Sequence, residues 1–272
     1  MPELPEVETI RRGIAPWVTA QRITAVTVRD GRLRWPVPPT LATALTGRTV
    51  VTVMRRAKYL ILRLDAGGDL LVHLGMSGRL CILPGPAPHG RHDHVELSLA
   101  SGQVLRFTDP RRFGTVLLAA DGAEHHPLLQ RLGPEPLDPA FNVAYLLGRA
   151  AGRQLAAKLF LMDSHIVAGV GNIYANEALF LAGVHPDSPA GRISRVRMAR
   201  LVGGVRQTLS QAIAAGGTTF RDFVGGDGQP GYFAQSLTVY GRQGQPCVRC
   251  ARPLKDSRIG GRATVFCSSC QR

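Results

Sequence analysis

The sequence contains no stretch that approaches the roughly 18 uninterrupted apolar residues required for a transmembrane helix. This absence excludes a protein that spans a membrane by such a helix. The first residues also lack the basic start and the apolar core of a secretory signal. We therefore expect the protein to stay in the cytoplasm.

Acidic residues are scarce relative to basic ones. The chain of 272 residues has 19 Asp and Glu against 33 Lys and Arg, which gives a formal net charge of +14. Such an excess favours polyanionic partners, above all the phosphates of nucleic acid. An arginine-rich or ribosome-associated protein would show the same balance, so the charge alone says nothing about chemistry. The length allows roughly two domains.

Cysteine is also rare, with five residues in all. Four of them form two CxxC pairs, Cys247 with Cys250 and Cys267 with Cys270, separated by sixteen residues. This spacing is typical of a four-thiolate zinc site in which the intervening residues form a small hairpin. Disulfides are the weaker explanation in a cytosolic chain. Cys81 lies alone in an apolar stretch, and we expect it to be a buried core thiol.

The first half of the chain has the pattern of a β-rich domain. Apolar residues at three- and four-residue spacing from Leu4 to Trp17 predict an amphipathic helix directly after the N-terminus. Short β-rich runs separated by glycine and proline turns follow, which is typical of a β-sandwich or barrel. These runs span residues 23–28, 49–64, 70–74, 94–99, 104–107 and 115–118.

The second half is predicted to be helical. Three prolines within residues 134–139 suit neither a helix nor a central strand, so residues 133–141 are interpreted as a linker. Helical signals follow at residues 143–149, 154–162, 173–182 and 194–215. A glycine-rich loop at 216–231 then separates these helices from the cysteine module.

The N-terminus has residues suited to nucleophilic chemistry. If Met1 were removed, Pro2 would become a terminal secondary amine, which can attack the anomeric carbon of a sugar and form an iminium. Glu3 beside it could donate or accept a proton. On these residues alone, a simple helix start is the preferred interpretation, and the nucleophile is the alternative.

Six separated motifs occur in the order found in one protein family: residues 2–9, 56–60, 73–78, 109–114, 169–174 and the closing cysteine module. On these motifs, and on the loop at 228–233, the whole chain closely resembles the formamidopyrimidine-DNA glycosylases, bifunctional enzymes that remove 8-oxoguanine and ring-opened purines. The resemblance implies an α+β fold. Its parts would be an N-terminal β-sandwich with a leading helix at 1–132, a linker at 133–141, a helix-two-turns-helix domain with a lesion-recognition loop at 142–233, and a zinc-finger β-hairpin domain at 234–272.

The resemblance also implies four catalytic residues. Pro2 would attack C1′ of the damaged nucleotide, and Glu3 would assist protonation at the sugar. Lys58 matches the family's residue for β-elimination, where a cation suits the departing phosphate. Arg262 matches its residue for δ-elimination and phosphate binding, which a guanidinium can perform in bidentate fashion. Four thiolates close the coordination sphere, so the implied single zinc ion is structural.

Seven further residues match positions at which the family contacts DNA: Met76, His92, Arg111, Phe113, Arg153, Lys158 and Asn172. Met76, Arg111 and Phe113 would fill the space left by a flipped nucleotide. Asn172, at the expected start of a helix, could face a phosphate. His94, by contrast, we expect to be a structural residue of a strand.

The implied partner is double-stranded DNA that contains oxidised purines or abasic sites. It would be bound by a monomer in the cytoplasm at the nucleoid, with no membrane involved. Two alternatives stay open. The endonuclease-VIII type shares the nucleophile and the zinc hairpin but prefers oxidised pyrimidines, although Leu4, the motif at 109–114 and the glycine-rich loop favour the purine type. A zinc-ribbon DNA-binding protein without catalysis would leave no covalent adduct on borohydride trapping.

Overall fold

The structure of the protein is a computed structural model that describes residues 2–85, 87–218 and 236–272. It contains two compact units, one of residues 1–131 and 216–232 and the other of residues 132–215 and 233–272. Each unit has its own hydrophobic core. Most of the glycine-rich loop expected at 216–231, and the whole of the loop at 228–233, lie outside the described residues.

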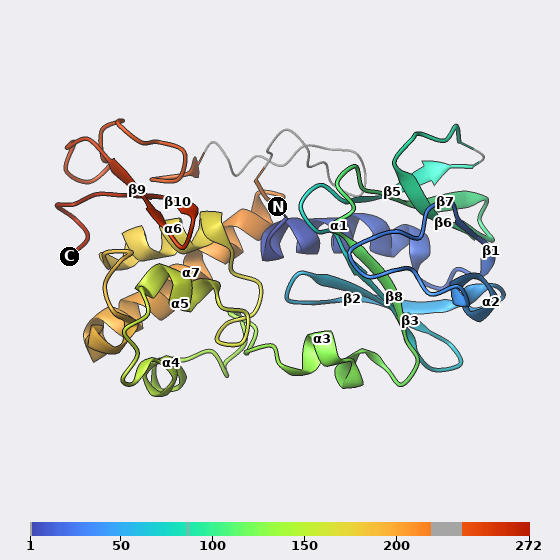
Figure 1. Cartoon of the computed structure of the whole chain (residues 1–272), viewed down its shortest axis with the longest axis horizontal. Helices are drawn as coiled ribbons and strands as arrows, with labels where there is room; N and C mark the ends of the chain where they lie inside the picture. Colours follow the sequence, from blue (N-terminus) through green and yellow to red (C-terminus); the bar gives the residue numbers. More distant parts are fainter. Residues whose placement is uncertain (1, 86, 219–235) are drawn as a thin grey trace. The chain divides into compact units, whose positions relative to one another are not determined.

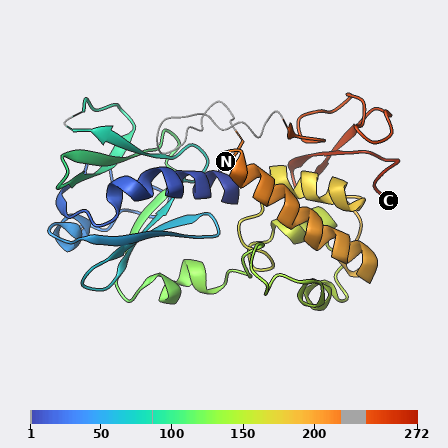
Figure 2. The ribbon, with the colours of Figure 1, turned by 180° about the vertical axis from the view of Figure 1, so that it is seen from behind.

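The first unit is a sandwich of two four-stranded antiparallel sheets, which confirms the predicted fold class (Figures 1 and 2). One sheet has the strand order β1-β6-β7-β5 and the other β2-β3-β4-β8. The strands are β1 (Ile23–Val28), β2 (Val50–Arg56), β3 (Tyr59–Leu64), β4 (Asp69–His73), β5 (Arg79–Pro84), β6 (Asp93–Leu99), β7 (Gln103–Thr108) and β8 (Thr115–Ala119). The short helices are α2 (Leu41–Leu45), η1 (Ala123–His125) and α3 (Pro127–Gln130).

The leading helix α1 (Leu4–Val18) is where the apolar spacing predicted it. Its buried stripe of Val7, Ile10 and Ile14 belongs to the core of the first unit. Burying each of these side chains stabilises the fold by about 1.5–3 kcal/mol. The helix contacts β2 and β3 of one sheet and β5 of the other, so the start of the chain is tied to both sheets.

Three features of the first unit differ from the sequence-based expectation. The run at 49–64 is a hairpin rather than one strand, because the chain turns at Ala57, which has a φ of 52°. No glycine, proline or asparagine marks this turn in the sequence. Strand β5 and helix α2 were not predicted. Cys81 is partly exposed rather than buried, because β5 is an edge strand of its sheet.

The second unit is helical, as expected, and contains α4 (Val143–Ala150), α5 (Ala157–Met162), α6 (Asn172–Ala182), η2 (Ala190–Arg192) and α7 (Arg195–Ala214). Helix α5 begins three residues later than predicted, because Ala156 forms a β-bridge with Pro189 instead of a helical turn. The proline-rich segment 133–141 packs on this unit. Phe141 is fully buried, and Arg206 donates hydrogen bonds to the carbonyl oxygens of Pro136, Asp138 and Phe141.

The cysteine module ends the second unit with the predicted hairpin, formed by β9 (Lys255–Ile259) and β10 (Arg262–Phe266). Gly260 and Gly261 make the two-residue turn, with φ values of 57° and 72°. Such a turn needs positive φ at both positions, which glycine adopts without steric cost. Across residues 2–85, 87–218 and 236–272, no helix is both long and apolar enough to cross a membrane.

Candidate functional site

Pro2 and Glu3 lie buried at the beginning of α1. Glu3 is 2% exposed and is the N-cap residue of the helix. Its backbone N–H donates to Oε2 of Glu6 at 2.8 Å, and the other carboxylate oxygen of Glu6 accepts from the backbone N–H of Thr218 at 2.8 Å. Glu6 therefore fixes the backbone of Glu3 and joins it to residue 218.

Lys58 lies in the turn between β2 and β3, next to the pair Tyr59 and His73. The rings of Tyr59 and His73 are 4.7 Å apart, and the N–H of Gly75 donates to Nδ1 of His73 at 3.0 Å. Burial, reinforced by the positive charges of Lys58 and Arg34, lowers the pKa of His73 to about 4. Burial also raises the pKa of Tyr59. His73 is therefore neutral at pH 7, and the ammonium of Lys58 stands near an uncharged ring.

Asp109 organises two loops of the first unit. Its fully buried carboxylate accepts hydrogen bonds from the Ser77 hydroxyl at 2.7 Å and from the Gly114 N–H at 2.7 Å. Its carbonyl oxygen lies 2.8 Å from Nε2 of His94, which is buried in β6 as expected. Gly75 lets the loops touch: it has a φ of 62°, and a Cβ there would lie 2.4 Å from the carbonyl carbon of Phe113.

These loops present Met76, Arg111 and Phe113 at the surface. Met76 is 41% exposed and Phe113 is 43% exposed, which is unusual for large apolar side chains. The Arg111 guanidinium carbon lies 4.9 Å from the centre of the Phe113 ring. The neighbouring Arg112 is instead paired with Asp30 at 2.5 Å. The structure thus brings the three residues together, and the Arg111 guanidinium forms no ion pair with a carboxylate of the described residues.

His92 is half-buried and ends the loop that precedes β6. Arg106 holds this loop by donating to the carbonyl oxygens of Pro88 at 2.8 Å and Ala87 at 3.0 Å. The same guanidinium pairs with Glu96 and Asp93, which lie with His89 in a trio of potential metal ligands. Because Arg106 pairs with both carboxylates and Arg29 lies 3.7 Å from Glu96, we interpret this trio as part of an ion-pair network.

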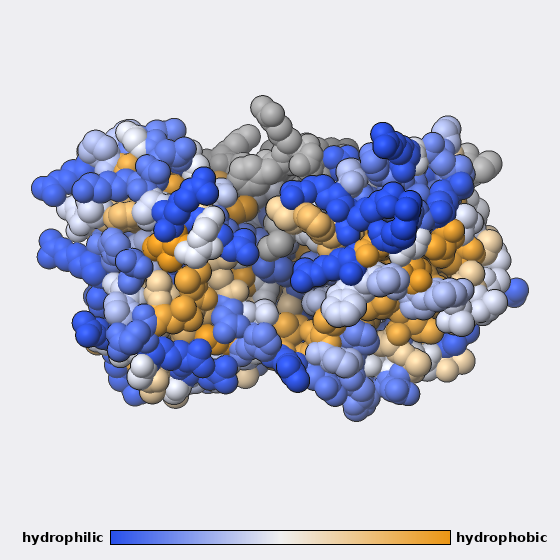
Figure 3. All heavy atoms as spheres, in the orientation of Figure 1, coloured by the Kyte–Doolittle hydropathy of each residue, from blue (hydrophilic) through white to orange (hydrophobic). Residues whose placement is uncertain are grey.

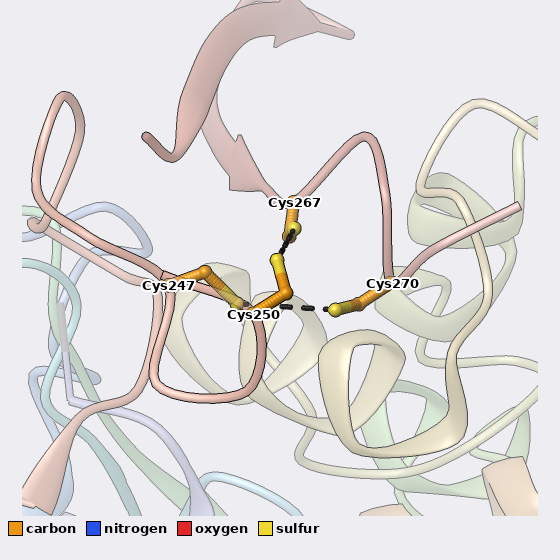
Figure 4. A group of neighbouring side chains, drawn as sticks. All are labelled: Cys247, Cys250, Cys267 and Cys270. Atoms are coloured by element: carbon orange, nitrogen blue, oxygen red, sulfur yellow. Dashed lines mark hydrogen bonds between the residues drawn. The ribbon is translucent and has the colours of Figure 1, made fainter. Parts of the chain in front are cut away.

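The four cysteine sulfurs converge on one point in the second unit (Figure 4). All four Sγ atoms lie within 4.8 Å of one another, with Cys250 and Cys267 at 3.5 Å and Cys247 and Cys270 at 4.0 Å. A tetrahedral zinc ion with Zn–S distances of about 2.3 Å requires sulfurs about 3.8 Å apart. The backbone N–H of Arg249 also points at Cys247 Sγ, at 3.4 Å, and would stabilise a thiolate. The residues fit one structural zinc ion.

Arg262 is exposed at the start of β10, and four of the five residues of β9 beside it are exposed. The face of the second unit drawn in Figure 3 carries hydrophilic side chains with hydrophobic ones between them. Lys158, on α5, holds β10 through hydrogen bonds. Its side chain is fully buried, and its Nζ donates to the Ala263 carbonyl oxygen and to Thr264 Oγ1, both at 2.7 Å. Lys158 is thus placed to position the hairpin, and its expected contact with DNA stays a prediction.

Asn172 begins α6, as predicted, and its Nδ2 donates to the Ala263 carbonyl oxygen at 3.2 Å. Asn176, one turn later, accepts from the Val265 N–H at 2.9 Å, so α6 is bonded to β10 at two points. Arg153, the remaining predicted contact, is exposed in the connection between α4 and α5. The second unit therefore holds Asn172 and Arg262 in a fixed relation.

Sequence reasoning gave no role to Glu6, His73, Ser77 and Asp109, although they lie within the motifs, and it missed Asn176 and Glu177 altogether. The clearest is Glu177, which is buried on α6 and accepts hydrogen bonds from the backbone N–H groups of Thr238, Val239 and Tyr240. The signal in the sequence was an acidic residue within an otherwise apolar helix. A carboxylate buried in such a helix must accept hydrogen bonds from elsewhere in the chain.

Comparison with known proteins identifies relatives along the whole chain. Residues 1–116 match the formamidopyrimidine-DNA glycosylase N-terminal domain, residues 132–224 its H2TH domain, and residues 244–272 the zinc finger found in FPG and IleRS. The formamidopyrimidine-DNA glycosylase of Alkalilimnicola ehrlichii is 56% identical over 100% of both chains. A variant of the Lactococcus lactis FPG, solved with DNA containing Fapy-dG, superimposes with a TM-score of 0.92 at 32% identity over 100% of both chains. The complex of that FPG with abasic-site DNA gives 0.91 at 31% over 99% of both.

Proposed function

Because the chain belongs to the formamidopyrimidine-DNA glycosylase family, we propose that it is a bifunctional DNA glycosylase and abasic-site lyase that removes 8-oxoguanine and formamidopyrimidines from double-stranded DNA. The observation that carries this proposal is the buried Pro2 and Glu3 pair at the N-terminal end of α1. In this proposal the protein acts as a monomer on DNA in the cytoplasm.

Base removal begins at the N-terminus. After removal of Met1, the nitrogen of Pro2 attacks C1′ of the damaged nucleotide, the glycosidic bond breaks, and the base leaves with its bonding electrons and takes up a proton. Glu3 supplies a proton at the sugar as the ring opens, and an iminium then joins Pro2 to C1′. The positive end of the α1 dipole disfavours protonation of an amine placed there, which keeps the attacking lone pair available.

Strand cleavage follows from the iminium, which acidifies the C2′ proton. Loss of that proton breaks the bond from C3′ to the 3′-phosphate oxygen, and the phosphate leaves as an anion. The ammonium of Lys58 stabilises the developing negative charge. Arg262 grips a phosphate and assists the second, δ-elimination. The neutral state of His73 supports this role of Lys58, since an uncharged ring does not repel the ammonium beside it.

Recognition of the lesion requires the damaged nucleotide to leave the DNA double helix. Met76, Arg111 and Phe113 fill the space that it leaves. Their exposure on two loops clamped by Asp109 supports this role, because a wedge must be rigid to offset an unstacking cost of a few kcal/mol. Arg111 rather than Arg112 can hydrogen-bond the unpaired base of the opposite strand, because Arg112 is already paired with Asp30. His92, Arg153 and Asn172 contact the DNA backbone. Bound zinc supplies no catalysis and fixes the hairpin that carries Arg262.

Borohydride trapping tests the proposal, because only an amine nucleophile leaves a covalent adduct on DNA. The protein with a free N-terminal Pro2 should form the adduct on duplexes with 8-oxoguanine, formamidopyrimidine or an abasic site. The same protein with an N-terminal extension left in place is the matched control and should form none, because its Pro2 nitrogen is an amide. Equal trapping by both proteins would refute Pro2 as the nucleophile. A stronger adduct on oxidised pyrimidines than on purines would instead indicate the endonuclease-VIII type.

A further inference from the structure

The second unit has a cavity of about 540 Å³ at the C-terminal end of α6. It is lined by the last turn of that helix, by Cys270 and by four arginines: Arg197, Arg200, Arg249 and Arg272. The arginines come from α7, from the first cysteine pair and from the end of the zinc finger. We call this cavity the arginine pocket. It adjoins the zinc site through Cys270, and its arginines have no role in the sites described above.

Two of the four guanidinium groups are held in place. Arg249 donates to the carbonyl oxygens of Phe180 at 3.0 Å and Leu181 at 3.1 Å, and it lies 4.5 Å from the centre of the Phe180 ring. Arg197 donates to the Gly183 carbonyl oxygen at 3.0 Å. These bonds add charged donors to the carbonyl groups at and just beyond the negative end of α6. A guanidinium has five N–H donors, so each arginine keeps donors for a ligand.

The positive charge of the four arginines is only partly balanced, by the zinc site: a zinc ion with four thiolates, of which Cys270 is one, carries a net charge of about −2. No Asp or Glu lines it, and none of its four arginines forms an ion pair within residues 2–85, 87–218 and 236–272. Elsewhere in the chain, Arg11, Arg55 and Arg106 each pair with a carboxylate. Like charges around a concave surface focus a positive potential, and an anion relieves their repulsion.

We propose that the arginine pocket binds a phosphate group of a second DNA segment, separate from the duplex that contains the lesion. The preference for a phosphate rests on the pocket alone, whereas its assignment to DNA rests on the proposed function. Bidentate donors from planar guanidinium groups match phosphate oxygens. The volume exceeds that of a free phosphate and leaves room for the adjoining sugar.

The position of the pocket along α6 separates it from the lesion duplex. Asn172, the proposed phosphate contact, begins α6, and the pocket lies at the other end of this eleven-residue helix. At 1.5 Å per residue the two ends are about 16 Å apart. A phosphate held by the N–H groups at the start of α6 lies beyond that end along the helix axis, whereas the pocket lies at the opposite end. A straight duplex that meets α6 at Asn172 would have to bend back along the helix to reach the pocket. Two DNA contacts on one unit would let the enzyme hold one segment while it probes another.

The test compares two double variants. Arg200→Ala with Arg272→Ala removes the two exposed arginines of the pocket, whose side chains make no hydrogen bond within the described residues. Arg192→Ala with Arg195→Ala removes the same charge from exposed positions outside the pocket. The protein is first trapped on an abasic duplex and then titrated with a labelled undamaged duplex at several salt concentrations.

The trapped wild-type protein and the control should bind the second duplex, and the pocket variant should bind it weakly. The salt slope of binding should fall by about 0.9 for each phosphate that the variant no longer neutralises. Excision rates on lesion duplexes should be equal for all three proteins. Equal second-duplex binding by the pocket variant and the control would overturn the proposal.

Titration with inorganic phosphate gives a second readout that does not depend on catalysis. The Nε–H signals of the pocket arginines should shift in the NMR spectrum of the free wild-type protein, and the shifts of Arg197 and Arg249 should be smaller in the pocket variant. If no adduct forms, the proposed function fails while this arm still tests the pocket. Phosphate binding without second-duplex binding would overturn the assignment to DNA, and the absence of both would overturn the site.

Discussion

Replacing Glu177 by Gln should loosen the attachment of the zinc finger to α6. The carboxylate is 3% exposed and accepts four hydrogen bonds from the segment that leads into the finger. One oxygen accepts from the backbone N–H of Thr238 at 2.8 Å and from the Thr238 hydroxyl. The other accepts from the N–H groups of Val239 at 3.0 Å and Tyr240 at 2.8 Å.

Glutamine keeps the shape of Glu177 but only one of its two acceptor oxygens. Its NH₂ group would face at least one N–H donor that is then left without a partner, which costs about 1–3 kcal/mol. The bonds that survive would go to a neutral rather than a charged acceptor, and each would weaken by about 1 kcal/mol. We therefore expect a local destabilisation of about 3 kcal/mol. This change corresponds to a roughly 100-fold rise in the local opening equilibrium.

Amide hydrogen exchange at residues 238–240 measures this opening directly, and it does not require the two compact units to unfold in a single transition. The control is Asp187→Asn, which removes one carboxylate from an exposed position of the same unit. Protection of the three amides should fall roughly 100-fold in Glu177→Gln and stay unchanged in the control. Equal protection in both variants would show that the carboxylate does not hold this segment.

Four further predictions address the candidate sites. Asp109→Asn should destabilise the first unit by about 2 kcal/mol, because the loops that carry Met76, Arg111 and Phe113 lose a shared hydrogen-bond acceptor. Single-turnover rates should show that the variant slows excision of lesions from duplex DNA more than cleavage of preformed abasic sites. His73 has a folded pKa of about 4, below its value of 6.5 in an unfolded chain, so its contribution to stability is present above pH 6.5 and is lost as the pH falls toward 4. The unfolding free energy of His73→Gln should lack this part of the pH dependence. An NMR titration midpoint near 6.5 for His73 would contradict the prediction. Cys250→Ser or a strong chelator should remove the zinc ion, whose apparent binding is on the order of 10 kcal/mol, and should unfold the hairpin as seen by metal analysis and near-UV circular dichroism. Arg262→Ala should lower the salt slope of binding to the lesion duplex by about 0.9 and shift the product from δ- toward β-elimination on a sequencing gel. Lys58→Ala should slow cleavage while the salt slope of binding is retained. Proportional losses of binding and cleavage in both variants would refute the separate roles.

The sequence by itself determined the elements whose signals are local. The three- and four-residue spacing from Leu4 to Ile14 placed α1, because the stripe that it forms must be buried whatever it packs against, although Trp17, the last residue of the pattern, is 48% exposed. The two CxxC pairs predicted a zinc hairpin, since ligand spacing is a property of short segments. The order of the motifs indicated the family and its expected site residues.

The tertiary structure decided what depends on neighbours distant in the chain. Lys158 is buried because Ala263 and Thr264, more than a hundred residues away, satisfy its ammonium. Asp30 pairs with Arg112 and leaves Arg111 exposed, although the two arginines are adjacent and identical in type. An ionised side chain is stable in a protein interior only when partners are supplied, and those partners are brought together by folding. Local pattern therefore marked which residues carry chemistry, and long-range contacts determined which of them face solvent.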